Sequence, residues 1–151
     1  MTSAVQQVAE SYSQWVTFML DEEVYGVNVM DVQEVLRVTD IAPVPGAPAY
    51  VLGIINLRGN VVSVLDTRSR FGLPPVENTD STRIIIIESG GQTVGIRVDA
   101  VAEVIDIENK EVETSPDIGN DDASRYICGM VSRGDDLFIL IDVNKIISTD
   151  F

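Results

Sequence analysis

Short runs rich in valine and isoleucine recur along the chain, and turn residues separate them. β-Branched side chains pack well on the pleated surface of a sheet, so each run predicts a strand. The predicted strands cover residues 15–20, 24–29, 51–57, 60–65, 82–88, 92–98, 101–107, 128–132 and 137–141. Many short strands at close spacing favour small closed or nearly closed barrels over an α/β sheet.

Helices are predicted only as short segments. Apolar residues between Val29 and Leu36 fall at three- and four-residue steps, so this segment predicts a helical turn with one buried face. Asp66 and Asp142 each follow a predicted strand and are suited to cap the N-terminus of a short helix. Residues 1–13 are polar and aperiodic, and we expect them to form a flexible N-terminal segment.

Two blocks of the sequence recur in the same order. Residues 25–36 align with residues 94–105 at an offset of 69 positions. Residues 53–66 align with residues 129–142 at an offset of 75 to 76. The matched positions include glycines, glutamates and aspartates, which favours duplication of a unit of roughly 70 residues over chance similarity between apolar strands. Two such lobes would each be near the lower size limit for a stable core, so we expect them to pack together with a groove between them.

The charge balance and the rare residue types exclude several classes of function. The chain carries 24 acidic and 10 basic residues, a formal net charge of −14, which disfavours nucleic acid and direct binding to an anionic membrane. It contains no histidine and only one cysteine, Cys128, so no internal disulfide is possible. The apolar runs are too short to span a membrane, and no signal peptide is recognisable. We therefore expect a cytoplasmic protein.

No catalytic constellation is recognisable. The sequence lacks a phosphate-binding loop, a cysteine pair for zinc and a histidine that could activate a serine. Helix capping explains Asp66 and Asp142 better than acid–base chemistry does, and the acidic pairs at 121–122 and 135–136 fit solvated turns better than cation sites. Cys128 lies in an apolar run and is predicted to be an inert core residue. We expect no catalytic residue, no cofactor and no metal site.

Arg58 stands out among the polar residues, because it lies between two apolar runs. A buried arginine is costly unless it is paired, and Glu34 on the predicted helical turn is a suitable partner. The pair would fix a loop or contact a binding partner. An exposed turn arginine without a special role remains the alternative at this point.

Several ordered motifs resemble those of the CheW family, the coupling proteins of bacterial chemotaxis. The motifs are Glu23-Val-Tyr-Gly-Val-Asn-Val29, Val32-Gln-Glu-Val35, Pro43-Val-Pro45, Gly53-Ile-Ile-Asn-Leu-Arg-Gly59, Val64-Leu-Asp66 and Val94-Gly-Ile-Arg-Val-Asp99. The resemblance extends from about Gln14 to Ile147, and the Asn-Leu-Arg-Gly stretch is its most specific part.

The resemblance implies a mainly β fold of two pseudo-repeated, five-stranded SH3-like barrels with short helices, packed around a shared core. It implies one domain over residues 14–147, made of two intertwined lobes. It also implies a non-enzymatic scaffold that joins the cytoplasmic tips of chemoreceptors to the regulatory domain of the histidine kinase CheA, in arrays at the inner membrane.

By motif, the resemblance also assigns the contact residues. The receptor contact would involve Val32, Glu34, Gly53, Arg58 and Gly95, and the kinase contact would involve Val27 and Val61. Two alternatives remain: a coupling protein of another chemosensory system, such as one that controls pili, and a small ligand-binding barrel with a polar pocket.

Overall fold

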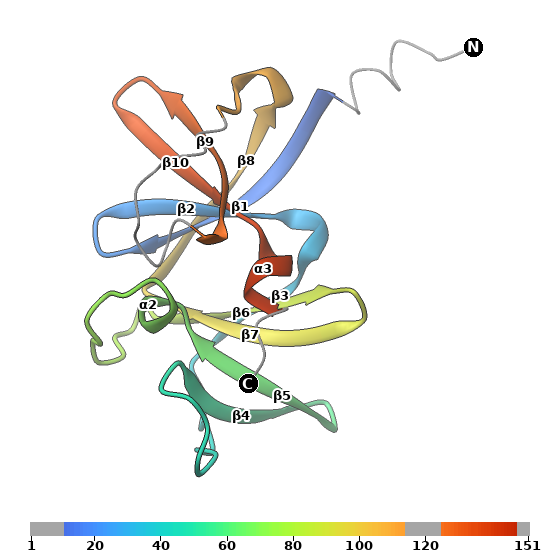
Figure 1. Ribbon diagram of the computed structural model, residues 1–151, viewed down its shortest axis with the longest axis vertical. Coiled ribbons are helices and arrows are strands. Elements are labelled where there is room, and N and C mark those ends of the chain that lie inside the picture. The colour runs from blue at the N-terminus through green and yellow to red at the C-terminus, as the bar shows by residue number, and fades with distance from the viewer. Residues whose placement is uncertain (1–10, 114–124, 148–151) are drawn as a thin grey trace.

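The computed structural model describes residues 11–113 and 125–147, in which short strands dominate and helices are few and short (Figure 1). The strands are β1 (Tyr12–Leu20), β2 (Glu23–Asn28), β3 (Val32–Arg37), β4 (Val51–Leu57), β5 (Asn60–Asp66), β6 (Arg83–Ser89), β7 (Gln92–Val98), β8 (Ala100–Glu108), β9 (Ile127–Arg133) and β10 (Asp136–Ile141). The short helices are α2 (Thr67–Arg70) and α3 (Val143–Ile147), and the 3-10 turns are η1 (Val29–Asp31) and η2 (Asn109–Glu111).

The strands form two five-stranded sheets. One sheet has the strand order β8-β1-β2-β10-β9, and we call it barrel A. The other has the order β3-β6-β7-β5-β4, and we call it barrel B. The predicted fold class, mainly β with two pseudo-repeated five-stranded units and short helices, is confirmed.

The two sequence repeats exchange strands between the barrels. When β1–β5 are matched in order to β6–β10, the strand orders of the two sheets coincide. Each barrel therefore takes its first two strands from one repeat and its last three from the other. The register supports the alignment, because Gly26 faces Leu140 in barrel A as Gly95 faces Val64 in barrel B. Neither half of the chain holds a complete sheet.

Single bridges bring the edges of each sheet together. Ala42, after β3, pairs with Ile54 of β4, and Glu113, after β8, pairs with Met130 of β9. These contacts lie at matching places in the two repeats. They curl each sheet towards an SH3-like barrel, although the ladder around the barrel is not continuous.

The hydrophobic core consists of one cluster that both barrels share and of one smaller cluster inside each barrel. The large shared cluster joins residues of both barrels and includes an aromatic series, Phe18–Tyr25–Phe71–Tyr126, with ring centroids 5.3–5.6 Å apart. Barrel B has its own interior cluster around Ile84 and Ile86. The interior cluster of barrel A surrounds Trp15, Ile107, Val131 and Leu140.

The prediction of a helical turn from Val29 to Leu36 is wrong. Only η1 is helical, and β3 begins at Val32. Residues 32–37 alternate between half-buried and exposed, which is the period of a strand. Pairing with the isoleucine-rich strand β6 decides the conformation, because β-branched residues accept either pattern in so short a segment.

Two further expectations differ from the structure. Cys128 is exposed, so its assignment to the core is wrong. β1 begins at Tyr12, three residues before the start of the strand predicted over residues 15–20. Residues 1–10 and the acidic pair at 121–122 lie outside the described residues, so the flexible N-terminal segment stays a prediction.

Candidate functional site

Apolar side chains remain accessible on η1, β3 and β8, next to the core that the two barrels share. Val29, Val32 and Val101 pack against the shared core but are only partly buried. Val35 on β3 and Val104 on β8 are 41% and 54% exposed. We call these five valines the junction strip.

The register explains why the strip faces solvent. Val35 lies opposite Ile85, and Val104 lies opposite Val16. Ile85 and Val16 belong to the shared core, and directly opposed residues of antiparallel strands lie on one face of a sheet. Because β3 and β8 are edge strands, this face continues past the shared core into solvent. The strip is thus an accessible extension of the core that joins the barrels.

A hollow of about 520 Å³ lies beside Val29 at one end of the strip. Its lining includes Tyr12, Asn28, Met30 and Asp106. Met30 is 83% exposed, an unusual exposure for a large apolar side chain. This hollow is shallow and mixed in polarity, which suits a protein partner better than an enclosed small molecule.

Arg58 and Glu34 form the ion pair that the sequence suggested. Arg58 Nη1 donates to Glu34 Oε2 at 2.6 Å, and Nη2 donates to Oε1 at 2.9 Å, so the pair is bidentate. These hydrogen bonds hold the pKa of Glu34 below its usual value. The Arg58 side chain is 69% exposed, so Arg58 is a surface turn residue that is nevertheless paired with Glu34.

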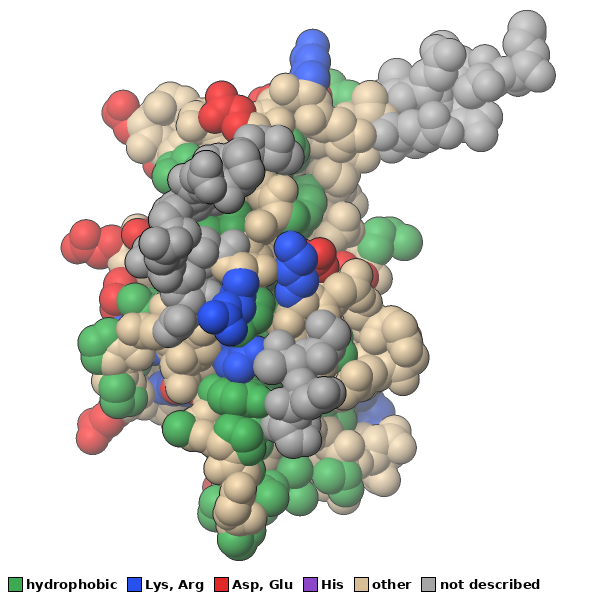
Figure 2. Space-filling view, in the orientation of Figure 1, with side chains coloured by type: hydrophobic (Ala, Val, Ile, Leu, Met, Phe, Trp, Pro, Cys, Tyr) green, Lys and Arg blue, Asp and Glu red, His purple; other side chains and the backbone are tan. Residues whose placement is uncertain are grey.

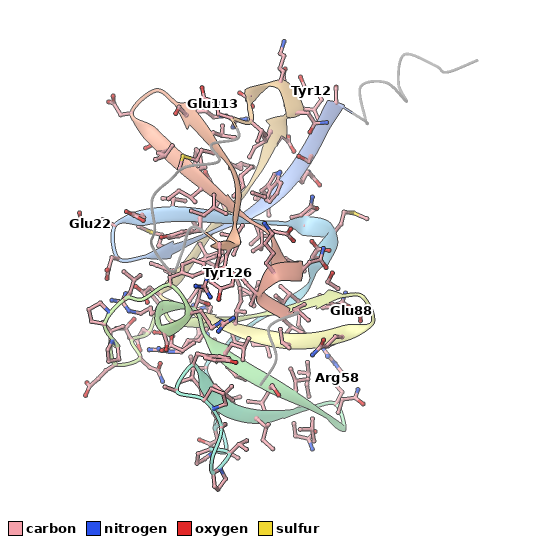
Figure 3. The ribbon with its side chains drawn as sticks, viewed as in Figure 1. Tyr12, Glu22, Arg58, Glu88, Glu113 and Tyr126 are labelled. Carbon is pink, nitrogen blue, oxygen red and sulfur yellow. The ribbon has the colours of Figure 1, made fainter. Side chains whose placement is uncertain are left out.

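The pair joins the two edges of barrel B. Arg58 is the first residue of a two-residue turn between β4 and β5, with φ of 51°, and the Asn56 side chain accepts a hydrogen bond from Gly59 N. Glu34 lies opposite Ile86 and therefore faces the interior side of barrel B. The ion pair thus fixes strand β3 from one side, while Val32 and Val35 of the same strand belong to the strip. Figure 3 shows Arg58 at the tip of the β4–β5 hairpin.

Gly53 and Gly95 are structural residues. A Cβ atom on Gly53 would lie 2.2 Å from the Ala42 carbonyl oxygen, and the Gly53 φ of 150° disfavours other residues. A Cβ on Gly95 would lie 2.8 Å from Ile84 Cγ2 inside barrel B. Both glycines are buried, so they shape the barrel that carries the strip and offer no side chain to a partner.

The two residues expected at a kinase contact lie in different surroundings. Val61 on β5 is 68% exposed. Val27 on β2 is fully buried in the shared core, so it cannot contact a partner directly in this conformation. Leu137 is the counterpart of Val61 in barrel A, since Val61 is the second residue of β5 and Leu137 the second residue of β10. Leu137 is exposed as well.

Barrel A also has an ion pair formed by an arginine near a hairpin turn, but its geometry differs from that of Arg58–Glu34. Arg133 is the last strand residue before its turn, whereas Arg58 lies within the turn. Arg133 Nη2 lies 2.9 Å from Glu111 Oε2 and also donates to the Asp106 carbonyl. The sequence alignment of the two arginines is therefore one position out of structural register.

The charged side chains are unevenly distributed over the surface. On the face in Figure 2, Lys and Arg side chains gather near the middle and Asp and Glu side chains lie towards the edges.

Within residues 11–113 and 125–147, no three His, Cys, Asp or Glu side chains are placed to bind a metal ion. In that same part of the chain, no helix has the length and apolar character needed to cross a membrane.

Met30, Val35 and Val104 were not predicted from the sequence as candidate site residues. Reading residues 32–37 with a two-residue period would have put Val35 on an exposed strand face. The repeat then points to Val104, which aligns with Val35 at the same offset of 69. Exposure of Met30 depends on packing and leaves no signal in the pattern.

Comparison with known proteins identifies the family of this chain. The family model for the CheW-like domain matches residues 14–151. The chemotaxis protein CheW of Treponema pallidum is 34% identical over 146 residues, covering 94% of this chain and 86% of the relative. That of Bacillus subtilis is 35% identical over 135 residues, covering 89% and 86%.

A solved structure is similar as well. The crystal structure of the scaffolding protein TtCheW from Thermoanaerobacter tengcongensis matches with a TM-score of 0.80 and 38% identity. The match covers 86% of this chain and 88% of that one. The family model matches nearly the whole chain, the relatives and the solved structure bear the same family name, and the chain belongs to the family of CheW-like domain proteins.

Proposed function

We propose that this chain is a non-enzymatic scaffold that couples chemoreceptors to the histidine kinase CheA in bacterial chemotaxis. The observation that carries the proposal is the junction strip, a partly exposed apolar surface on η1 and the edge strands β3 and β8 of a CheW-family fold. Exposed apolar surface on a strongly acidic protein marks a protein partner. The chain would act in the cytoplasm and be recruited to receptor arrays at the inner membrane.

The receptor surface is the junction strip. The tip of a receptor is a helical hairpin, and a helix binds by placing a few apolar anchors on such a surface. Val32 would contact the receptor directly. Glu34 and Arg58 would hold β3 in place, while Gly53 and Gly95 would support the strand positions from inside barrel B.

The kinase surface is on the outer side of β5. Val61 offers the exposed apolar side chain for this contact. Val27 would support β2 from the core without touching the kinase. We expect the regulatory domain of CheA to be the partner at this surface.

Co-sedimentation with receptor-bearing membranes, with and without the kinase, tests the proposal. Arg58→Glu places two carboxylates together at β3 and should weaken receptor binding at least about tenfold. The double variant Arg58→Glu/Glu34→Arg restores opposite charges and should recover much of the binding. Arg133→Glu is the matched control, because it makes the same charge change in the ion pair of barrel A.

Each outcome has a definite meaning. If Arg58→Glu binds receptors as well as wild type, the role given to the ion pair is wrong. If the folded wild-type protein sediments with neither receptors nor kinase, coupling in chemotaxis is wrong, and receptors of another chemosensory system, such as one for pili, become the next partners to test.

A further inference from the structure

The apolar residues of the junction strip repeat from one barrel to the other. Val32 and Val35 on β3 match Val101 and Val104 on β8 at the offset of 69, and the members of each match are similarly exposed. Both strands are edge strands at the same place in their sheets. A helix that recognised apolar anchors alone could therefore lie on the strip in two opposite directions.

One end of the strip carries two arginines. Arg37, the last residue of β3, is exposed and lies opposite Arg83 of β6. Residues two apart along a strand share a face, so both arginines lie on the face of Val35. Arg83 Nη1 donates to the carbonyls of Asp80 and Thr82, at 2.7 and 2.9 Å. Like charges directly opposite each other destabilise a sheet, so the fold itself gains nothing from this pair of cations.

Carboxylates of the same chain do not neutralise these arginines. Within residues 11–113 and 125–147, Arg37 and Arg83 form no ion pair, whereas five other basic residues do. Those five are Arg58, Arg68, Arg97, Lys110 and Arg133. In a chain with 24 acidic and 10 basic residues, two neighbouring arginines without a carboxylate partner can attract an anionic group of a binding partner.

The matching positions at the other end carry the opposite charge. The offset of 69 matches Arg37 to Asp106 of β8 and Arg83 to Gln14 of β1. Asp106 and Gln14 lie opposite each other, and Gln14 Nε2 donates to Asp106 Oδ1 at 3.1 Å. Asp106 is exposed and lies on the face of Val104, two residues before it. The apolar part of the strip is thus repeated, but its charges are not.

The two charged ends are separated by the length of β3. Asp106 lines the same hollow as Val29 and Met30, at the start of β3. Arg37 lies at the other end of β3, which begins at Val32. At a rise of about 3.3 Å per residue, these two ends of the strand are about 16 Å apart. About eleven residues of α-helix span this distance.

We propose that the charges at its two ends fix the direction in which a helix lies on the junction strip. The occupant is a helix of the receptor tip with apolar anchors, an acidic side chain that meets Arg37 and Arg83, and a basic side chain about three turns away that meets Asp106. In the opposite direction, the same helix would bring like charges together at both ends, which disfavours that direction. That the occupant is a receptor rests on the proposed function.

Charge reversal at one end at a time tests the proposal. Arg37→Glu/Arg83→Glu makes both ends acidic, and Asp106→Arg makes both ends basic. Either variant has one mismatched end in both helix directions, so each should weaken co-sedimentation with receptor membranes about fivefold. Attraction through net charge alone predicts opposite effects, because one variant is more acidic than wild type and the other less. Lys110→Glu and Asp135→Arg, exposed and off the strip, are the matched controls and should bind like wild type.

An exchange between the matching positions tests the direction itself. The exchange variant keeps the composition and the net charge of the chain: Gln14→Arg/Arg37→Asp/Arg83→Gln/Asp106→Arg. A photo-crosslinking amino acid in place of Val35 or Val104 identifies the receptor residues that face each strand. In the exchange variant, the residues labelled from the two positions should change places, or binding should weaken if the receptor tip cannot turn round. Wild-type affinity together with wild-type labelling would overturn the proposal.

Salt and folding controls separate charge from packing. The loss in Arg37→Glu/Arg83→Glu should shrink between 0.1 and 1 M salt, where the Debye length falls from about 10 to about 3 Å. The loss in Val35→Ala should persist, since it removes an apolar contact. Urea denaturation confirms that each variant unfolds cooperatively, and Arg37→Gln, a milder change at an exposed position, replaces the double reversal if that variant does not fold.

Receptor binding by the wild type distinguishes the two proposals. If wild type binds receptors and the folded variants at both ends bind equally well, the charges do not orient the partner, and the coupling function stands. If folded wild type does not bind receptors at all, the coupling function is wrong, and the receptor helix as occupant of the strip is wrong with it.

Discussion

The two barrels follow one plan, yet they hold their edge strands in different ways. In barrel B, the exposed pair Arg58–Glu34 spans directly from the β4–β5 turn to β3. In barrel A, Arg133 reaches Glu111 beyond the end of β8 and the backbone of Asp106. A shift of one residue in the hairpin thus directs a repeated arginine to a different partner, so a repeated motif does not guarantee a repeated role.

The interior of the barrels shows a second difference at the same strands. In barrel A, the Thr17 hydroxyl donates to the Glu103 carbonyl at 2.7 Å and accepts from Glu103 N at 3.0 Å, inside the irregular β1–β8 pairing. The matching residue in barrel B is Ile86, since Thr17 and Ile86 face Gly26 and Gly95. Barrel A therefore holds its edge strand from within, while barrel B relies on an ion pair at the surface, where a partner can reach it.

The glycines next to the barrel-closing bridges give the sharpest test of the comparison. Gly53→Ala places a Cβ 2.2 Å from a backbone oxygen at a strained φ, and we expect a loss of about 3–5 kcal/mol in unfolding free energy. Gly129→Ala meets the Val112 side chain at 2.5 Å, which can shift, so its loss should be about 1–3 kcal/mol. Urea denaturation measures both. Equal losses would show that the two bridges are equivalent.

Thr17 of barrel A should contribute more to the unfolding free energy than its small side chain suggests. Thr17→Val keeps the shape but removes both hydrogen bonds to Glu103, and we expect a loss of about 1–3 kcal/mol in unfolding free energy. Ile86→Val removes one methylene from barrel B and should lose about 0.5–1.5 kcal/mol. A smaller loss for Thr17→Val than for Ile86→Val, measured by urea denaturation, would show that the internal hydrogen bonds do not stabilise barrel A.

The smallest expected effect concerns the carboxylates beside the helices. Asp66 on the α2 side faces Arg97, whereas Asp142 on the α3 side has Asp31 nearby. Burial and the charge of Asp142 raise the pKa of Asp31 above its usual 3.8, so ionised Asp31 destabilises the folded state. Asp31→Asn should therefore raise stability at pH 7, by less than about 1 kcal/mol because the site is solvent-screened.

The sign of that effect fixes its pH dependence. As the pH falls through the raised pKa of Asp31, wild type binds a proton in the folded state and regains stability. The advantage of Asp31→Asn should shrink there and vanish below pH 3.8. Urea midpoints at pH 7 and pH 4 measure it, with the exposed Asp135→Asn as control. An advantage that does not change with pH would contradict this origin.

The hairpins and helix caps can be predicted from the sequence, whereas strand β3 cannot. The hairpins are recovered because β-branched runs and turn residues are local signals, as in β4–β5 with its Arg58-Gly59 turn. The helix caps are recovered too: Asp66 accepts from Arg68 N at 3.2 Å and Asp142 accepts from Asn144 N at 2.9 Å. β3 is missed because an edge strand of six residues has too few positions to separate two periods.

The candidate site is only partly predictable for a similar reason. The Arg58–Glu34 pair follows from charge and from the isolation of Arg58 in an apolar stretch. The exposure of Val61 and the burial of Val27 do not follow, because both are valines in strands. Which face of a strand meets solvent depends on what packs against it.

By itself, the sequence determined the strand content, the duplication, the absence of histidine chemistry and the family motifs, since these depend on residue type and order. Only the tertiary structure decided that the repeats exchange strands, that Arg68 is buried between two aspartates, and that Val35 and Val104 lie beside the core yet in solvent. The physical reason is that pairing between distant strands sets both register and burial, and no local pattern contains that information.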